Sequence, residues 1–124
     1  NYNILGIANE TPKWNYDYFN ELSKCKIALN LSRGKPIKQT SSNRIASLIG
    51  NGIYTFVDYK TKYNKIFNEE EVGSYKSVDD LGKKVEKLLL KPELIEKYAK
   101  NGKEKYFLLY NSKKIAKNII ELTF

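Results

Sequence analysis

The sequence predicts an α/β domain with a parallel sheet of about four strands. Short apolar segments with strand character alternate with segments whose apolar residues recur at helical spacing, and this alternation is typical of a parallel sheet with helices on both faces. The last third of the chain carries three helical patterns in succession. A length of 124 residues suits one core, so residues 1–124 are expected to form a single domain.

Four segments are expected to form the strands. The most distinctive is IYTFV at residues 53–57, because every residue in it is β-branched or aromatic. KIALNL at residues 26–31 is mostly apolar, as a strand buried on both faces should be. ILGI at residues 4–7 and VGSY at residues 72–75 complete the set.

Helices are expected between and after these strands. Apolar residues recur at helical spacing over residues 15–25 and over a short stretch at 45–50. Ser77 begins a capping-box-like sequence, Pro92 suits the first turn of the next helix, and Ser112 is expected to cap the last one. The result is a small Rossmann-like domain, in which ligands bind beyond the carboxyl ends of the strands.

Aromatic residues and apolar helix faces indicate where the core lies. Tyr54, Phe56 and Phe107 are candidates for burial, and Val78 belongs to the apolar face of the first C-terminal helix. Trp14 and the aromatic residues after it are expected to bury the first helix, with a surface that stacks on a sugar or a base as the alternative.

The residue inventory excludes several kinds of chemistry. The chain has no histidine and a single cysteine, Cys25, which is expected to be a packed thiol. Histidine-based catalysis, an internal disulfide and the usual zinc sites are therefore ruled out, and we expect neither a metal nor a cofactor. No apolar run approaches the roughly 20 residues that span a bilayer. We expect a cytoplasmic protein, with peripheral contact at the inner face of the membrane left open.

The net charge of +8 is unevenly distributed. No acidic residue occurs over residues 22–57, whereas this segment contains Lys24, Lys26, Arg33, Lys35, Lys38 and Arg44. The local excess of positive charge indicates an anionic ligand, and a solvated lysine-rich surface is the alternative. Both arginines of the chain lie here and favour the ligand, because a guanidinium matches phosphate oxygens better than an ammonium does.

A phosphate site is predicted where the helix at residues 45–50 begins. Ser41, Ser42 and Asn43 are residue types that cap helix N-termini, and a helix start offers unpaired backbone N–H groups to an anion. Arg44 lies in the first turn and is expected to reach the same anion. Ordinary capping without a ligand is the alternative. Neither a P-loop motif nor G-x-G-x-x-G occurs in the sequence.

Several short motifs, taken in order, resemble those of a known family. They are Ala28-Leu29-Asn30-Leu31-Ser32, Ser42-Asn43-Arg44 followed by Gly52, Thr55-Phe56-Val57-Asp58, Tyr75-Lys76-Ser77-Val78-Asp79-Asp80-Leu81 and Tyr98-Ala99-Lys100-Asn101-Gly102. From about residue 23 to residue 110, their order and spacing resemble the C-terminal domain of group 1 glycosyltransferases. The branch that matches best is similar to spore-maturation glycosyltransferase-like proteins.

This resemblance implies one half of a GT-B fold, the half that binds the nucleoside-diphosphate sugar, of the UDP or GDP type. It also implies a partner domain on the N-terminal side that binds the acceptor, so the chain would be a fragment of a longer two-domain protein and inactive by itself. The residues expected to bind the donor are Ser32, Arg33, Gly34, Lys35, Ser41, Ser42, Asn43, Arg44, Ser47 and Gly52.

The chain departs from the family pattern at two positions. Ser47 and Gln39 stand where related enzymes carry glutamates, and the first of these glutamates commonly binds the donor ribose. A serine hydroxyl at position 47 can still form a hydrogen bond with a sugar hydroxyl. Even so, the two-carboxylate pattern is missing, which leaves a glycosyltransferase-like binding module without activity as an alternative.

Two further classes of protein were weighed against this interpretation. The net charge permits a nucleic-acid-binding module, but acids are interleaved along the C-terminal helices and no such signature occurs, so we expect no nucleic acid partner. A phospho-receiver domain would place its acceptor at Asp58. It also needs an acidic pair after the first strand to hold Mg²⁺, and Ala8-Asn9-Glu10 offers at most one carboxylate.

Overall fold

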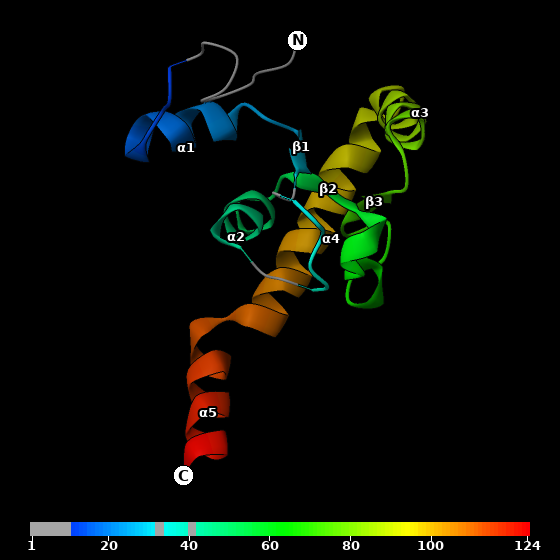
Figure 1. The fold of residues 1–124 in the computed structure, drawn as a ribbon. Helices are drawn as coiled ribbons and strands as arrows, with labels where there is room; N and C mark the ends of the chain where they lie inside the picture. Colours follow the sequence, from blue (N-terminus) through cyan, green and yellow to red (C-terminus); the bar gives the residue numbers. More distant parts are fainter. Residues whose placement is uncertain (1–10, 32–33, 40–41) are drawn as a thin grey trace.

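The structure is a computed structural model, and it describes residues 11–31, 34–39 and 42–124. The strand expected at residues 4–7 lies outside this range. The described elements are α1 (Asn15–Ser23), β1 (Ile27–Asn30), α2 (Asn43–Gly50), β2 (Tyr54–Asp58), the short 3-10 turns η1 (Tyr59–Thr61) and η2 (Tyr63–Lys65), β3 (Gly73–Tyr75), α3 (Val78–Leu89), α4 (Pro92–Tyr110) and α5 (Ser112–Thr123). Figure 1 shows α4 as the long helix that runs beside the sheet from α3 to α5.

Within the described residues the sheet has three strands in the order β1-β2-β3, and both pairings are parallel. The register places Asn30 opposite Val57 and Asp58 opposite Tyr75. The last residues of all three strands therefore lie at one edge of the sheet. The expected parallel sheet is confirmed, and the arrangement is that of a small Rossmann-like domain.

The side chains of β2 alternate between two packed layers, because successive residues of a strand point to opposite faces. Tyr54 and Phe56 pack against buried residues of α3 and α4. Val57 packs against Ile45 and Ile49 of α2, together with Tyr63 from the segment after β2. Helices thus cover both faces of the sheet, as the apolar character of this strand predicts.

Capping residues explain where the helices of the last third begin. The Ser77 hydroxyl accepts a hydrogen bond from the backbone N–H of Asp80 at 3.1 Å, and Pro92 is the first residue of α4, as expected. The start of α5 differs from expectation. Asn111, not Ser112, is the N-cap, because its side-chain oxygen accepts from the backbone N–H of Lys114 at 2.9 Å.

Three residues expected in the core are exposed. Phe107 is 51% exposed because α4 extends beyond the sheet there, and Figure 1 shows α5 continuing away from the body of the domain. Val78 is 81% exposed because it occupies the first position of α3, before the apolar face of that helix reaches the sheet. Trp14 is 76% exposed at the N-cap of α1, and of the aromatic residues near it only Tyr18 packs against the cluster around Leu22.

Gly102 fixes the distance between α4 and the loop before β3. It is buried, and a Cβ atom at this position would overlap the backbone carbonyl oxygen of Glu71. The neighbouring Lys105 forms an ion pair with the Glu71 carboxylate at 2.7 Å, which holds the loop against the same helix. The glycine at position 102 therefore allows α4 to pack closely against the loop before β3.

Replacement of Gly102 by alanine is expected to lower the free energy of unfolding by about 1–3 kcal/mol, because the helix must move away from the Glu71 carbonyl. Gly82→Ala is the matched control: Gly82 is an exposed residue of α3 with open space around it, so alanine there should raise stability by about 0.5–1 kcal/mol. Urea unfolding curves of the two variants measure both effects. Equal stabilities for the two alanine variants would contradict the proposed close approach.

Candidate functional site

A pocket of about 370 Å³ opens at the carboxyl edge of the sheet. It lies between the end of β1, the first turn of α2 and the segment that follows β2. We call it the carboxyl-edge pocket. Its lining consists of Asn30, Leu31, Lys35, Ile37, Ser42, Asn43, Arg44, Ile45, Thr61 and Tyr63. This is the edge at which open parallel α/β sheets bind ligands.

The first turn of α2 presents backbone N–H groups to this pocket. Ser42 is the N-cap, and its hydroxyl accepts a hydrogen bond from the backbone N–H of Ile45 at 3.3 Å. The N–H groups of Asn43 and Arg44 occupy the first two helical positions and have no partner within the helix. Together with the positive end of the helix dipole, they favour a bound anion.

Arg44 joins the start of α2 to the end of β1. One guanidinium nitrogen, Nη1, donates a hydrogen bond to the carbonyl oxygen of Leu31 at 2.7 Å. The side chain is exposed, and a guanidinium carries five N–H donors, so this contact orients the group and leaves further donors for a ligand. Lys35 adds a second positive charge to the same lining.

Asn30 ends β1 and forms part of the pocket wall. It is only 8% exposed, yet its side-chain amide has no hydrogen-bond partner in the structure of the described residues. Every fully enclosed side-chain nitrogen or oxygen of the described residues does have a partner. The amide of Asn30 is therefore not fully enclosed, and the residue lines the pocket.

Thr61 and Tyr63 form the wall opposite α2. The hydroxyl of Thr61 donates to the carbonyl oxygen of Asp58 at 2.6 Å, which fixes the turn after β2. Burial raises the pKa of Tyr63 to about 12, and the nearby Tyr110 and Tyr106 add to this effect. Tyr63 is therefore neutral at physiological pH and does not act as a base there.

The structure brings together four of the residues predicted to bind the donor, because Lys35, Ser42, Asn43 and Arg44 all line the carboxyl-edge pocket. Gly34 is exposed on the loop beside Lys35 and is not part of the lining. Ser32, Arg33 and Ser41 lie outside the described residues.

Ser47 and Gly52 lie elsewhere. Ser47 is half-buried one turn beyond Arg44 and does not line the pocket, and its carbonyl accepts a hydrogen bond from the Asn51 side chain at 2.6 Å. Gly52 follows the C-terminal end of α2, where its φ of +75° makes the turn into β2. That turn is on the opposite edge of the sheet, so Gly52 shapes the backbone there and does not contact this pocket.

Part of the positive charge of residues 22–57 also lies at the opposite edge. Lys24 forms an ion pair with Glu21 at 2.9 Å, and Lys26 forms one with Glu96 at 2.5 Å. The absence of acids in this stretch of sequence therefore overstates the field at the carboxyl edge. In the described part of the pocket lining the positive charges are Lys35 and Arg44, and no carboxylate accompanies them.

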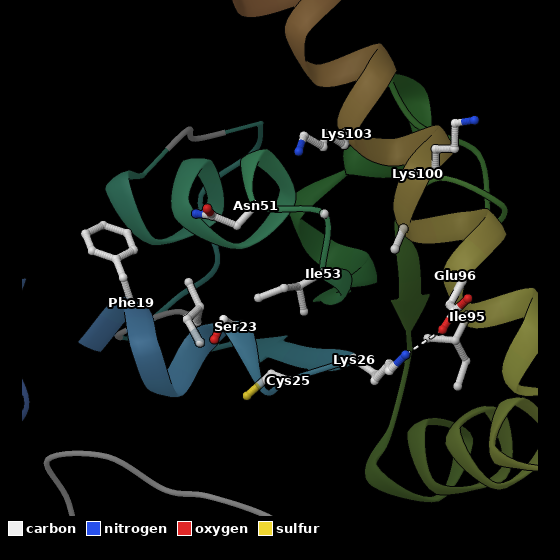
Figure 2. A pocket seen from close by; sticks show the side chains of 13 residues that line it. Phe19, Ser23, Cys25, Lys26, Asn51, Ile53, Ile95, Glu96, Lys100 and Lys103 are labelled. Carbon is white, nitrogen blue, oxygen red and sulfur yellow. Dashed lines mark hydrogen bonds and ion pairs between the residues drawn. The ribbon is translucent and has the colours of Figure 1, made fainter. Parts of the chain in front are cut away.

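A larger pocket, of about 510 Å³, lies at the amino edge of the sheet between α1, α2 and α4. Figure 2 shows Lys26 and Glu96 pointing toward each other across it, and this contact holds the pKa of Glu96 below its usual value. The polar side chains of α1 and α2 here are already paired: Ser23 donates to the Asn20 carbonyl, and Asn51 to the Ser47 carbonyl. The Cys25 thiol, packed as expected, donates to the carbonyl of Glu21. A ligand that used any of these groups would have to replace an existing contact.

Sequence patterns missed Asn30, Ile37, Thr61 and Tyr63 as part of the site. Asn30 carried one signal, because a polar residue ending an apolar strand at the ligand-binding edge is unusual in a core. Thr61 and Tyr63 lie in the segment after β2, which was expected to border the ligand. Which residues of this segment line the pocket depends on the two 3-10 turns, and these were not predicted.

The described residues contain neither a metal-binding cluster of side chains nor a membrane-spanning helix. Among them, no group of at least three His, Cys, Asp or Glu side chains is placed to hold a metal ion. No helix in the described part of the chain combines the length and apolar character needed to cross a bilayer.

Comparison with known proteins identifies the family. The model of a family described as glycosyl transferase-like matches residues 1–121. No curated protein and no solved structure matches the chain. Because the family model covers nearly the whole sequence, and because the α/β fold with its parallel sheet agrees with it, the chain belongs to the glycosyl transferase-like family.

Proposed function

We propose that this chain is the donor-binding domain of a GT-B glycosyltransferase and that a nucleoside-diphosphate sugar binds in the carboxyl-edge pocket. The observation that carries the proposal is the position of the α2 N-terminus, with Ser42 and Arg44, in the wall of this pocket. Unpaired N–H groups, a helix dipole and a guanidinium converge there, and together they suit the two phosphates of a nucleoside diphosphate.

The size of the pocket supports a binding site that is completed by a second domain. Ligand pockets commonly measure about 300–1,000 Å³, and 370 Å³ is near the lower limit. Such a volume can surround the pyrophosphate and one ring, but not a whole nucleotide sugar and an acceptor. We infer that the remaining wall and the acceptor site come from a partner domain, as the family resemblance implies.

The described lining of the pocket has no acidic residue that could act as a catalytic base. Sugar transfer needs a group that removes a proton from the acceptor hydroxyl, and aspartate, glutamate and histidine are the usual residues for this role. The described lining has none of them, and the chain has no histidine. The proposal is therefore that this domain binds and orients the donor, while the base is supplied from the partner domain.

A thermal-shift panel of UDP, GDP, ADP, TDP and CMP tests the proposal directly. A bound ligand stabilises the native state by RT ln(1 + [L]/Kd), so at ligand concentrations about 100 times Kd the gain is about 2.7 kcal/mol. A selective shift by one nucleoside diphosphate would identify the base. A chain that responds to none of them would contradict the proposed function.

Arg44→Ala is expected to weaken the binding of that nucleoside diphosphate by about 1.5–3 kcal/mol, the range for a hydrogen bond to a charged group. The fold should survive, because Arg44 is exposed and loses only its contact with the Leu31 carbonyl. Titration calorimetry gives the affinity, and the free nucleoside should be affected much less.

Lys113→Ala is the matched control for Arg44→Ala, since it removes one exposed positive charge from α5, far along the chain from the pocket. Its affinity for the nucleoside diphosphate should equal that of the wild type. Equal losses in the two variants would mean that Arg44 acts only through the net charge of the protein.

Ser42→Asp should separate helix capping from ligand binding. Aspartate is as good an N-cap as serine, so α2 should keep its stability. Its carboxylate would face the proposed phosphate, and two unit charges roughly 6 Å apart at an effective dielectric of about 20 repel by about 3 kcal/mol. Ser42→Asn, a neutral cap, should bind the nucleoside diphosphate more tightly than Ser42→Asp. Equal affinities in calorimetry would place the phosphates away from this helix.

The purified chain is expected to show no sugar transfer and no hydrolysis of nucleotide sugars. The physical reason is the lack of a general base among the described pocket residues and the need for an acceptor site. Coupled assays of nucleoside diphosphate release measure both activities. Turnover above the background rate would show that a catalytic group lies within this chain.

A further inference from the structure

Asn30 differs from the other buried polar residues of the described chain. Thr55 donates to the Ile53 carbonyl at 2.9 Å, Thr61 donates to Asp58, and Ser74 is bonded to Glu69. The amide of Asn30 has no comparable partner among the described residues, although the residue is only 8% exposed. An amide that has no protein partner adds no hydrogen bond to the stability of the fold, so its presence in a largely buried residue at a strand end requires an explanation.

Its location supplies that explanation. Asn30 shares the lining of the carboxyl-edge pocket with the first turn of α2, and its amide atoms are not fully enclosed. A leucine of similar size would fill this position at no cost in unpaired polar atoms. An amide at this position is hydrated when the pocket is empty, and a ligand that pairs with it takes the place of that water.

The chemistry of a carboxamide limits which part of a ligand it can contact. It offers two N–H donors and one carbonyl acceptor, and it is neutral. Phosphate oxygens only accept hydrogen bonds, and the α2 start, Arg44 and Lys35 already provide charged or N–H partners for them. Adjacent hydroxyls of a sugar ring both donate and accept, so they can satisfy both sides of the amide.

A nucleobase edge could also pair with an amide, but bases are commonly held by stacking on an aromatic face. Tyr63 is the aromatic residue of the described lining, and it is 4% exposed. Its ring is already stacked on Phe67, with the centroids 6.1 Å apart and the planes 15° from parallel. The described wall around Asn30 therefore suits hydroxyl groups better than a base.

We propose that Asn30 is a specificity-determining residue that binds hydroxyl groups of the sugar ring joined to the ligand's phosphates. This inference rests on the proposed function, and it names the chemical group that a neutral amide in the pocket wall selects. The ring is either the ribose of the nucleotide or the transferred sugar, because both are attached to the same pyrophosphate.

Asn30→Leu tests the inference through stability and binding together. The melting temperature of the free protein should stay the same or rise, because the substitution removes an amide that has no partner to lose. Asn118→Leu is the matched control, since Asn118 is an exposed residue of α5. A lower melting temperature for Asn30→Leu alone, with unchanged ligand affinities, would assign Asn30 a structural role and overturn the proposal. If the leucine variant does not fold, Asn30→Ala serves for the same measurements.

Binding is measured by calorimetry with inorganic pyrophosphate, UDP, 2′-deoxy-UDP, UDP-glucose, the corresponding guanosine compounds and glucose 1-phosphate. Asn30→Leu should bind pyrophosphate as the wild type does, and the probe that carries the recognised sugar about ten-fold more weakly. A loss for UDP that is absent for 2′-deoxy-UDP would assign Asn30 to the ribose. A loss that appears only with the nucleotide sugars would assign it to the transferred sugar.

The remaining outcomes separate this inference from the proposed function. Binding of both nucleoside diphosphates and nucleotide sugars that is independent of Asn30, or an equal loss for pyrophosphate, would overturn the inference and leave the donor-binding function intact. Binding of glucose 1-phosphate that depends on Asn30, without any response to nucleotides, would support the inference and overturn the nucleotide-sugar function. A wild-type chain that binds none of the probes would overturn both.

Discussion

The parallel pairing of β2 with a strand on each side is the constraint on which the rest of the structure depends. Both backbone edges of β2 are bonded and both of its faces are covered, so the strand has one permitted register. That register brings the ends of β1 and β2 to the same edge. Asn30, the start of α2 and the turn at Thr61 can surround one pocket only because these ends coincide.

Local patterns in the sequence predicted the elements that depend on local physics. The strands β1 and β2 are formed by mostly apolar or β-branched segments. The N-caps of α2 and α3 are serines whose hydroxyls accept the expected hydrogen bonds. The predicted anion site depends on the same property, because a helix N-terminus is created by its own first turn. Ser42 and Arg44 could therefore be placed at the start of the same helix without knowledge of the tertiary fold.

Features that depend on distant contacts were not predictable in this way. Gly52 seemed part of the site by its spacing in a family motif, but an eight-residue helix spans about 12 Å and carries it to the other edge of the sheet. Phe107 has the apolar character of a core residue, but it is exposed because α4 extends beyond the sheet that would cover it. Asn30 carried only the weak signal of a polar residue at the end of an apolar strand, because a sequence does not reveal whether a buried amide has a partner.

The two pockets differ in how far their polar side chains are already paired with other protein groups. In the amino-edge pocket, Lys26 is neutralised by Glu96, and a ligand there would have to break an existing contact to gain a new one. In the carboxyl-edge pocket, the guanidinium of Arg44 is oriented by a single contact and the amide of Asn30 by none within the described residues. A ligand that used the remaining donors of Arg44 and the amide of Asn30 would displace no protein partner of these groups, and this is why the smaller pocket is the proposed donor site.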